Sequence, residues 1–220
     1  MRRYTTVLFD LDGTLIDSIR LILDSYHHTF AAHGLPPCAD DVLLRGVGTP
    51  LRTQLAGYSD DPEVVLAMIE TYRAYNLMHH DACVRPYPGA VESVRALAGA
   101  GVKVAIVTSK NRHSTKRGLE VAGLADAFEV LVCSDDVTNP KPHKEPVDLA
   151  LARLGSRPGE ALFVGDSLHD MHAGRSAGVA TGAALWGPMT RADLAPSEPS
   201  HWLSKPEDLL PLVLARVSGE

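Results

Sequence analysis

The sequence predicts an α/β fold in which a parallel sheet is covered by helices on both faces and is interrupted near its start by an all-helical block. Residues 86–185 alternate between amphipathic helical periods and short apolar runs, a pattern typical of parallel strands joined by helical crossovers. A further apolar run, residues 4–10, opens the chain. Residues 17–85 contain helical periods and no convincing strand. In such a sheet, ligands bind at the carboxyl ends of the strands.

Length and composition narrow the class of protein. The 220 residues, 45% of them hydrophobic and 5% aromatic, fit one globular domain or a core with a small insert. A formal net charge of -6 and the lack of a basic run argue against a nucleic-acid partner. The three cysteines lack disulfide or zinc spacing, and no stretch has the length of a signal peptide or a membrane span. We therefore expect a cytoplasmic protein without a membrane partner, monomeric or homodimeric.

In the first half of the chain, residues 4–10 are predicted to form a strand. Asp17-Ser18 then favours the start of a helix, and apolar residues between Ile19 and Phe30 recur at helical spacing. Residues 34–37, Gly-Leu-Pro-Pro, end this helix. Further helical periods cover residues 39–44, 50–55 and 62–78.

From residues 86–89, Pro-Tyr-Pro-Gly, the pattern changes to alternating helices and strands. Strands are predicted where apolar, often β-branched, residues cluster between turn residues. The predicted helices are residues 90–98, 114–121 and 147–154, and the predicted strands are residues 102–107, 129–132, 161–164 and 180–185. Residues that follow these strands should meet residues 10–12 at one edge of the sheet.

The apolar run that begins at Val7 ends in two acids, Asp10 and Asp12, followed by Gly13. Alternation along a strand puts both carboxylates on one side, where the strand opens into a loop. Like charges so close repel one another, so the arrangement is costly unless a cation or a reacting group lies between them. A simple Asp-Gly turn is the alternative interpretation.

Three later segments place polar residues after a predicted strand. Thr108 and Ser109 offer hydroxyl and backbone N–H groups that could hold phosphoryl oxygens, although such residues before a helix are often only caps. Residues 141–146, Lys-Pro-His-Lys-Glu-Pro, contain a lysine that in isolation would be solvated. Residues 165–170, Gly-Asp-Ser-Leu-His-Asp, hold two acids that face one point if a helix begins near Ser167. An N-cap acid beside a solvated acid is the alternative there.

Together the four segments resemble the motifs of the haloacid dehalogenase (HAD) superfamily. The resemblance implies that Asp10 is the nucleophile that takes the phosphoryl group. Asp12 would protonate the leaving oxygen and later activate water. Thr108 or Ser109 would bind the phosphoryl group, and Lys141 would bridge the nucleophile and the phosphate.

The same resemblance implies a Mg²⁺ cofactor. Asp166 would ligate Mg²⁺ together with Asp10 and the backbone carbonyl of Asp12, while Asp170 would order metal-bound water. Lys144 stands where the superfamily usually has a proline, so whether it faces the site or the solvent stays open.

The resemblance also divides the chain into a Rossmann-like core, residues 1–16 and 86–220, and a helical cap, residues 17–85. The cap would close over the site and select the substrate. Residues 44–52 resemble the specificity loop of small-capped phosphatases. The candidates for substrate binding in this loop are Arg45, Gly48 and Arg52. The two arginines could pair with a substrate carboxylate or a second phosphate, since arginine binds both through paired hydrogen bonds. A surface salt bridge is the alternative for each arginine.

Within the superfamily, residues 86–89 and 165–167 are similar to the phosphoglycolate phosphatase group. Leu185-Trp186, Arg191 and residues 206–210 resemble a related bacterial inorganic pyrophosphatase. We therefore predict a Mg²⁺-dependent phosphatase that acts on a small anionic metabolite through an aspartyl-phosphate, with phosphoglycolate as the first candidate and pyrophosphate as the second. A phosphosugar mutase and a non-catalytic phospholigand-binding protein are the remaining alternatives, and the acid at position 12 argues against a dehalogenase.

Overall fold

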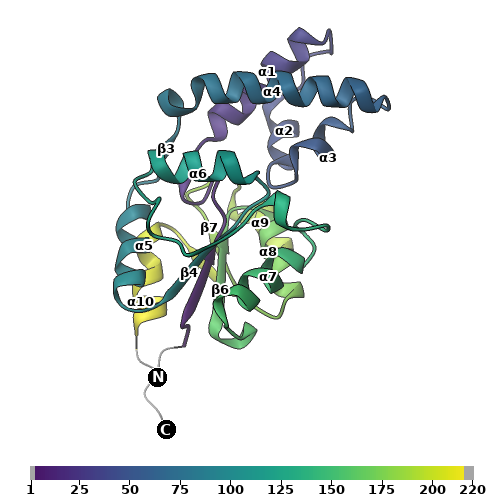
Figure 1. Cartoon of the computed structure of the whole chain (residues 1–220). Helices are drawn as coiled ribbons and strands as arrows, with labels where there is room; N and C mark the ends of the chain where they lie inside the picture. The colour runs from purple at the N-terminus through teal and green to yellow at the C-terminus, as the bar shows by residue number, and fades with distance from the viewer. Residues whose placement is uncertain (1–2, 216–220) are drawn as a thin grey trace.

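The chain is built around a six-stranded parallel sheet with strand order β5-β4-β1-β6-β7-β8 (Figure 1). The computed structural model describes residues 3–215. The strands are β1 (Thr6–Phe9), β4 (Lys103–Val107), β5 (Val130–Val132), β6 (Ala161–Gly165), β7 (Ala180–Ala184) and β8 (His201–Leu203). The predicted parallel sheet is therefore confirmed.

The strand β1 occupies the centre of the sheet. Thr6 pairs with Lys103 of β4 on one side and with Ala161 of β6 on the other, and the register continues to Phe9. All four residues of β1 are buried, because helices cover both faces of the sheet. The residue that follows β1 is consequently held between the carboxyl ends of two neighbouring strands.

Two layers of helices cover the sheet. Residues of α5 (Ala90–Gly99), α6 (Arg112–Val121) and α10 (Leu209–Leu214) share one hydrophobic cluster with the sheet. Residues of α7 (Glu145–Leu154) and α8 (Leu168–Ser176) share the cluster on the opposite face. The short helix α9 (Arg191–Leu194) and the 3₁₀ turns Ser134–Asp136, Pro158–Glu160, Ala195–Ser197 and Pro206–Asp208 lie in the connections.

Four helices precede this alternating part and lie beyond the carboxyl ends of the strands (Figure 1). They are α1 (Ile19–Ala32), α2 (Asp40–Gly46), α3 (Leu51–Leu55) and α4 (Pro62–Cys83). They enclose a separate hydrophobic cluster that includes Tyr26, Phe30 and Met68. The predicted all-helical block is therefore present.

The two passages between the helical block and the sheet lie side by side. β2 (Ile16–Asp17) pairs antiparallel with β3 (Arg85–Pro86). These short strands include residues 17 and 85, the two ends of the block in which no strand was expected. The division into a cap of residues 17–85 and a core of residues 1–16 and 86–220 stays a prediction. The ends of that core, residues 1–2 and 216–220, lie outside the described residues.

The predicted strands and helices of both halves are found, with ends that differ by a few residues. The strand β8 was missed, because it has only three residues and includes a histidine and a tryptophan without an apolar alternation. No helix in the described part of the chain is both long and apolar enough to cross a membrane.

Candidate functional site

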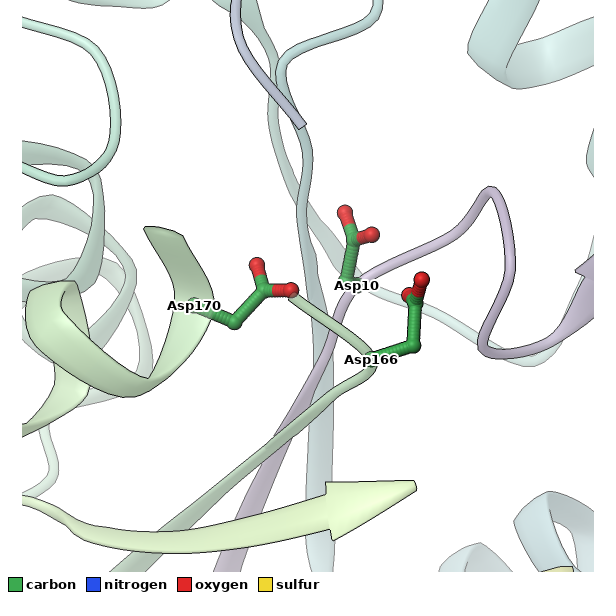
Figure 2. Close-up of side chains that lie close together, drawn as sticks. All are labelled: Asp10, Asp166 and Asp170. Carbon is green, nitrogen blue, oxygen red and sulfur yellow. The ribbon is translucent and has the colours of Figure 1, made fainter. Parts of the chain in front are cut away.

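Three carboxylates converge at the carboxyl edge of the sheet (Figure 2). Asp10 follows β1 directly, Asp166 follows β6, and Asp170 lies in the first turn of α8. The backbone N–H of Asp10 donates to the carbonyl of Val164 at 2.9 Å, which continues the pairing of the two strands to the site itself. One oxygen from each acid lies within 4.8 Å of the others, and all three acids are buried. The sequence placed these residues at one edge, and the structure brings them together.

Lys141 lies among these acids. Its Nζ donates to Asp10 Oδ1 at 2.8 Å, to Asp170 Oδ1 at 2.6 Å and to the carbonyl of Val107 at 3.2 Å. Its side chain is almost completely buried. Burial by itself would lower the pKa of Lys141, but the charges of Asp10 and Asp170 raise it, so the lysine stays protonated.

The carboxyl group of Asp10 is poised between two opposing effects. Burial raises its pKa more than the charge and hydrogen bond of Lys141 lower it, so that the pKa lies at about 7 instead of the ordinary 3.8. The negative charge of Asp170 acts in the same direction as burial. Together these effects leave more negative charge at this edge than Lys141 alone neutralises.

Asp166 has a comparable environment. Its burial and the charges of Asp10 and Asp170 hold its pKa well above the usual range, while the hydroxyl of Thr14 donates to its Oδ1 at 2.7 Å. Gly13, at φ +83°, lies so close that a Cβ on it would collide with the Asp166 carboxylate. The Asp-Gly turn therefore allows the loop after β1 to approach Asp166 closely, a function beyond that of a simple turn.

Both oxygens of Asp170 already accept hydrogen bonds from the protein. Oδ1 accepts from Lys141, and Oδ2 accepts from the backbone N–H of Ser167 at 3.1 Å and from its hydroxyl at 2.6 Å. Ser167 is the N-cap of α8 and forms a capping box with Asp170, as the expected helix start implied. This set of partners agrees with an outer position for Asp170, although its role stays a prediction.

Asp12 faces a different cation from Asp10. Its Oδ1 accepts from Lys110 Nζ at 2.6 Å and from the hydroxyl of Ser18 at 2.5 Å. Burial would raise the pKa of Asp12, but the charge and hydrogen bond of Lys110 and the hydrogen bond from Ser18 lower it below the usual value. Lys110 was not predicted from the sequence as a site residue, although its place after Thr108-Ser109 puts it at the same sheet edge.

The loop after β4 carries the predicted phosphoryl-binding residues. The N–H of Thr108 donates to the carbonyl of Val132 at 2.9 Å, and its hydroxyl accepts from the N–H of Lys110 at 3.2 Å. The hydroxyl of Ser109 donates to the carbonyl of Gly48 at 2.5 Å. The helical block thus touches the sheet edge through the backbone of the loop that was predicted to determine specificity.

A cavity of about 310 Å³ lies between the helical block and the sheet edge. Asp10, Asp12, Thr108, Ser109 and Lys110 line its sheet side, and Gly48, Arg52 and Arg73 are among the residues from the block.

Of the two arginines predicted to bind substrate, Arg52 lines the cavity and Arg45 does not. Arg73, which was not predicted, also lines it. Within residues 3–215, neither Arg52 nor Arg73 has a carboxylate within ion-pair distance, whereas Arg45 pairs with Asp41 at 3.0 Å on the surface. Arg73 was missed from the sequence because the helical period of α4 does not show which of its faces meets the cavity. Lys144 pairs with Asp148 at 2.8 Å, is half exposed and also lies outside the cavity lining.

A central strand that ends in an acid, with a buried lysine and further acids beside it, is the arrangement expected for the predicted class of phosphoryl-transfer enzyme. The family of haloacid dehalogenase-like hydrolases matches residues 7–184. The chain belongs to this family, and it is a HAD-type phosphatase, as its four motifs predicted.

Relatives with similar sequences extend over nearly the whole chain. The chain is 42% identical over 208 residues to the pyrophosphatase PpaX of Anoxybacillus flavithermus, covering 94% of this chain and 96% of the relative. It is 40% identical over 208 residues to the pyrophosphatase PpaX of Bacillus pumilus, covering 94% and 95%.

Solved structures support the same fold. A predicted phosphatase from Clostridium acetobutylicum superimposes with a TM-score of 0.83 at 25% identity, covering 94% of this chain and 96% of that one. A predicted phosphoglycolate phosphatase from Haemophilus somnus gives a TM-score of 0.86 at 24% identity, covering 96% and 98%. The similarity at 24% identity concerns the fold alone.

Proposed function

We propose that the chain hydrolyses a small anionic phosphate compound with Asp10 as the nucleophile. The observation that carries this proposal is the buried contact of Lys141 with Asp10, which places a fixed cation where a phosphoryl group would be transferred. The carboxylate of Asp10 attacks phosphorus, and the bond between phosphorus and the leaving oxygen breaks. Asp12 gives a proton to that oxygen and then takes one from the water that releases phosphate from Asp10.

The donor set suits Mg²⁺, which prefers carboxylate oxygens and keeps waters that neighbouring acids can orient. Burial, and after it the charges of neighbouring carboxylates, raise the pKa values of Asp10 and Asp166, and a cation between the two acids would offset both effects. With the backbone carbonyl of Asp12 they would hold the ion, and Asp170 would orient its waters. When bound, Mg²⁺ would neutralise charge on the transferred phosphoryl group.

Phosphoglycolate is the first candidate substrate, because Arg52 and Arg73 offer the cavity two guanidinium groups without carboxylate partners among the described residues. Pyrophosphate is the second, and the PpaX relatives favour it. The helices of residues 17–85 would act as the cap that excludes water during phosphoryl transfer. A cytoplasmic location remains the expectation from the sequence.

Phosphate release with Mg²⁺ tests the proposal on phosphoglycolate, pyrophosphate, hexose phosphates and nucleoside monophosphates. Asp10→Asn should abolish turnover of every compound while the circular-dichroism spectrum stays that of the wild type. Hydrolysis by this variant would exclude the aspartyl-phosphate route. Failure of the wild-type protein to release phosphate from any of these compounds would leave a non-catalytic phospholigand-binding protein as the better interpretation.

A further inference from the structure

The cavity has two chemically different walls. The wall from the sheet edge is polar, with acids, hydroxyl groups and Lys110. The opposite wall, from the helical block, combines apolar and aromatic side chains with polar ones. The apolar and aromatic ones are Ile22, Tyr26, Val47, Leu51, Tyr72 and Leu77, and the polar ones are Thr49, Arg52, Gln54, Arg73 and Asn76.

Most of the apolar part of this wall is one face of the hydrophobic cluster of the helical block. Ile22, Tyr26, Val47 and Tyr72 belong to that cluster, and the rings of Tyr26 and Tyr72 meet edge to face at 4.9 Å. The cluster thus lies directly behind the cavity. Across the cavity it faces polar residues, and no apolar side chain among residues 3–215 lines that side to complete its packing.

An apolar wall is a poor partner for a ligand that is charged on all sides. Placing an anion against apolar side chains costs free energy unless each charge is paired, whereas burying a methylene group gains about 0.8 kcal/mol. The volume of about 310 Å³ also lies at the lower end of the range of roughly 300–1,000 Å³ in which organic ligands bind. Pyrophosphate could pair with the arginines of this wall but would leave its apolar side chains without a complementary surface.

We propose that the preferred substrate is a phosphate monoester whose leaving group has an apolar carbon body longer than that of glycolate and ends in a second anionic group. The scissile phosphate lies at Asp10, the carbon body packs against the apolar wall, and the second anion meets Arg52 or Arg73. This proposal rests on the phosphatase function proposed above, and it replaces phosphoglycolate as the preferred substrate by a longer relative of the same class.

A matched series of substrates tests it. The members are ω-phosphooxy carboxylates that run from phosphoglycolate, with one methylene, to longer chains, so the two charged groups stay constant and only the apolar length changes. The measured quantity is kcat/KM for phosphate release with Mg²⁺. It should rise about fourfold with each added methylene until the cavity is full. Pyrophosphate should fall below the best member.

Two variants assign the effect to the wall. Leu77→Ala shortens a side chain that lines the cavity and should lower kcat/KM for the longer members by at least fourfold more than for phosphoglycolate. Leu35→Ala makes the same change in a half-buried leucine that packs on the hydrophobic cluster of the helical block but lies outside the cavity lining, and it should affect all members alike. Thermal unfolding of both variants checks that each is folded.

The outcomes separate the two proposals. Hydrolysis of phosphoglycolate or pyrophosphate without a rise along the series would overturn the substrate class and leave the phosphatase function standing. Equal effects of the two leucine variants on all members would show that the wall serves only for packing and would likewise overturn it. The absence of phosphate release from every compound would overturn both proposals.

Discussion

Replacement of Lys141 by methionine removes the cation that lies among the buried acids while keeping a side chain of similar length. The Nζ atom that donates to Asp10 at 2.8 Å and to Asp170 at 2.6 Å would be lost, and both carboxylates would stay buried. Removing one partner of a buried ion pair costs about 3–5 kcal/mol, because the other charge is left uncompensated. We expect the free energy of unfolding of Lys141→Met to fall by about that amount.

Urea unfolding at pH 7 in the presence of a chelator measures this loss without a contribution from bound metal. Lys144→Met is the matched control, since Lys144 lies three residues away and pairs with Asp148 at 2.8 Å with both side chains substantially exposed. An exposed pair of this kind contributes about 0.5 kcal/mol or less. The two substitutions are chemically identical and differ in the burial of the pair they break.

A fall of less than about 1 kcal/mol for Lys141→Met would refute the reasoning, because it would mean that the acids do not depend on the lysine for compensation. A fall of the same size in both lysine variants would also refute it, since burial would then have no effect. Lys141→Met should also lose phosphate release, because the lysine is proposed to contact the transferred phosphoryl group.

Further predictions concern the pH dependence, the second acid and the arginines. Because burial raises the pKa of Asp10 from 3.8 to about 7, its contribution to stability is present at low pH and is lost as the pH rises through about 7. In chelator, Asp10 should therefore contribute a fall of about 2–3 kcal/mol in the free energy of unfolding from pH 5 to pH 8. Asp10→Asn should make the dependence less steep, while Asp166, whose pKa is also raised, keeps part of it; a flat wild-type profile in urea unfolding contradicts this prediction. Asp12→Asn should lower kcat by about 10²–10⁴-fold in steady-state assays, and normal turnover would remove Asp12 from the acid–base role. Arg52→Ala should reduce kcat/KM for phosphoglycolate at least tenfold, and Arg45→Ala should reduce it less than twofold. The reverse order would contradict the assignment of Arg52, and not Arg45, to substrate binding.

The sequence was sufficient to predict the sheet edge of the site. Asp10, Thr108 and Asp166 each follow an apolar run, and parallel crossovers bring the carboxyl ends of such runs together. Their convergence therefore follows from local periodicity and a topological rule, without knowledge of packing.

Contacts that depend on the relative placement of distant segments could not be predicted in this way. Lys110 reaches Asp12 across 98 positions of sequence, and no local pattern specifies that pairing. Arg73 lies on α4, where periodicity identifies the packed face but not the neighbour of the opposite face. The surface ion pair of Arg45, in contrast, could be predicted from the sequence. Asp41 lies four residues earlier on the same helix, a spacing that favours an ion pair.

The two acids of the first motif have pKa values displaced in directions opposite to their proposed roles. The nucleophile must be ionised, yet burial raises the pKa of Asp10, and the acid must be protonated, yet Lys110 lowers the pKa of Asp12. A divalent cation beside Asp10 and Asp166 would lower the pKa of the nucleophile. A substrate anion near Lys110 would compete for that lysine and raise the pKa of Asp12. On the proposed roles, binding of the cation and of the substrate would therefore each move one of the two acids toward its working protonation state.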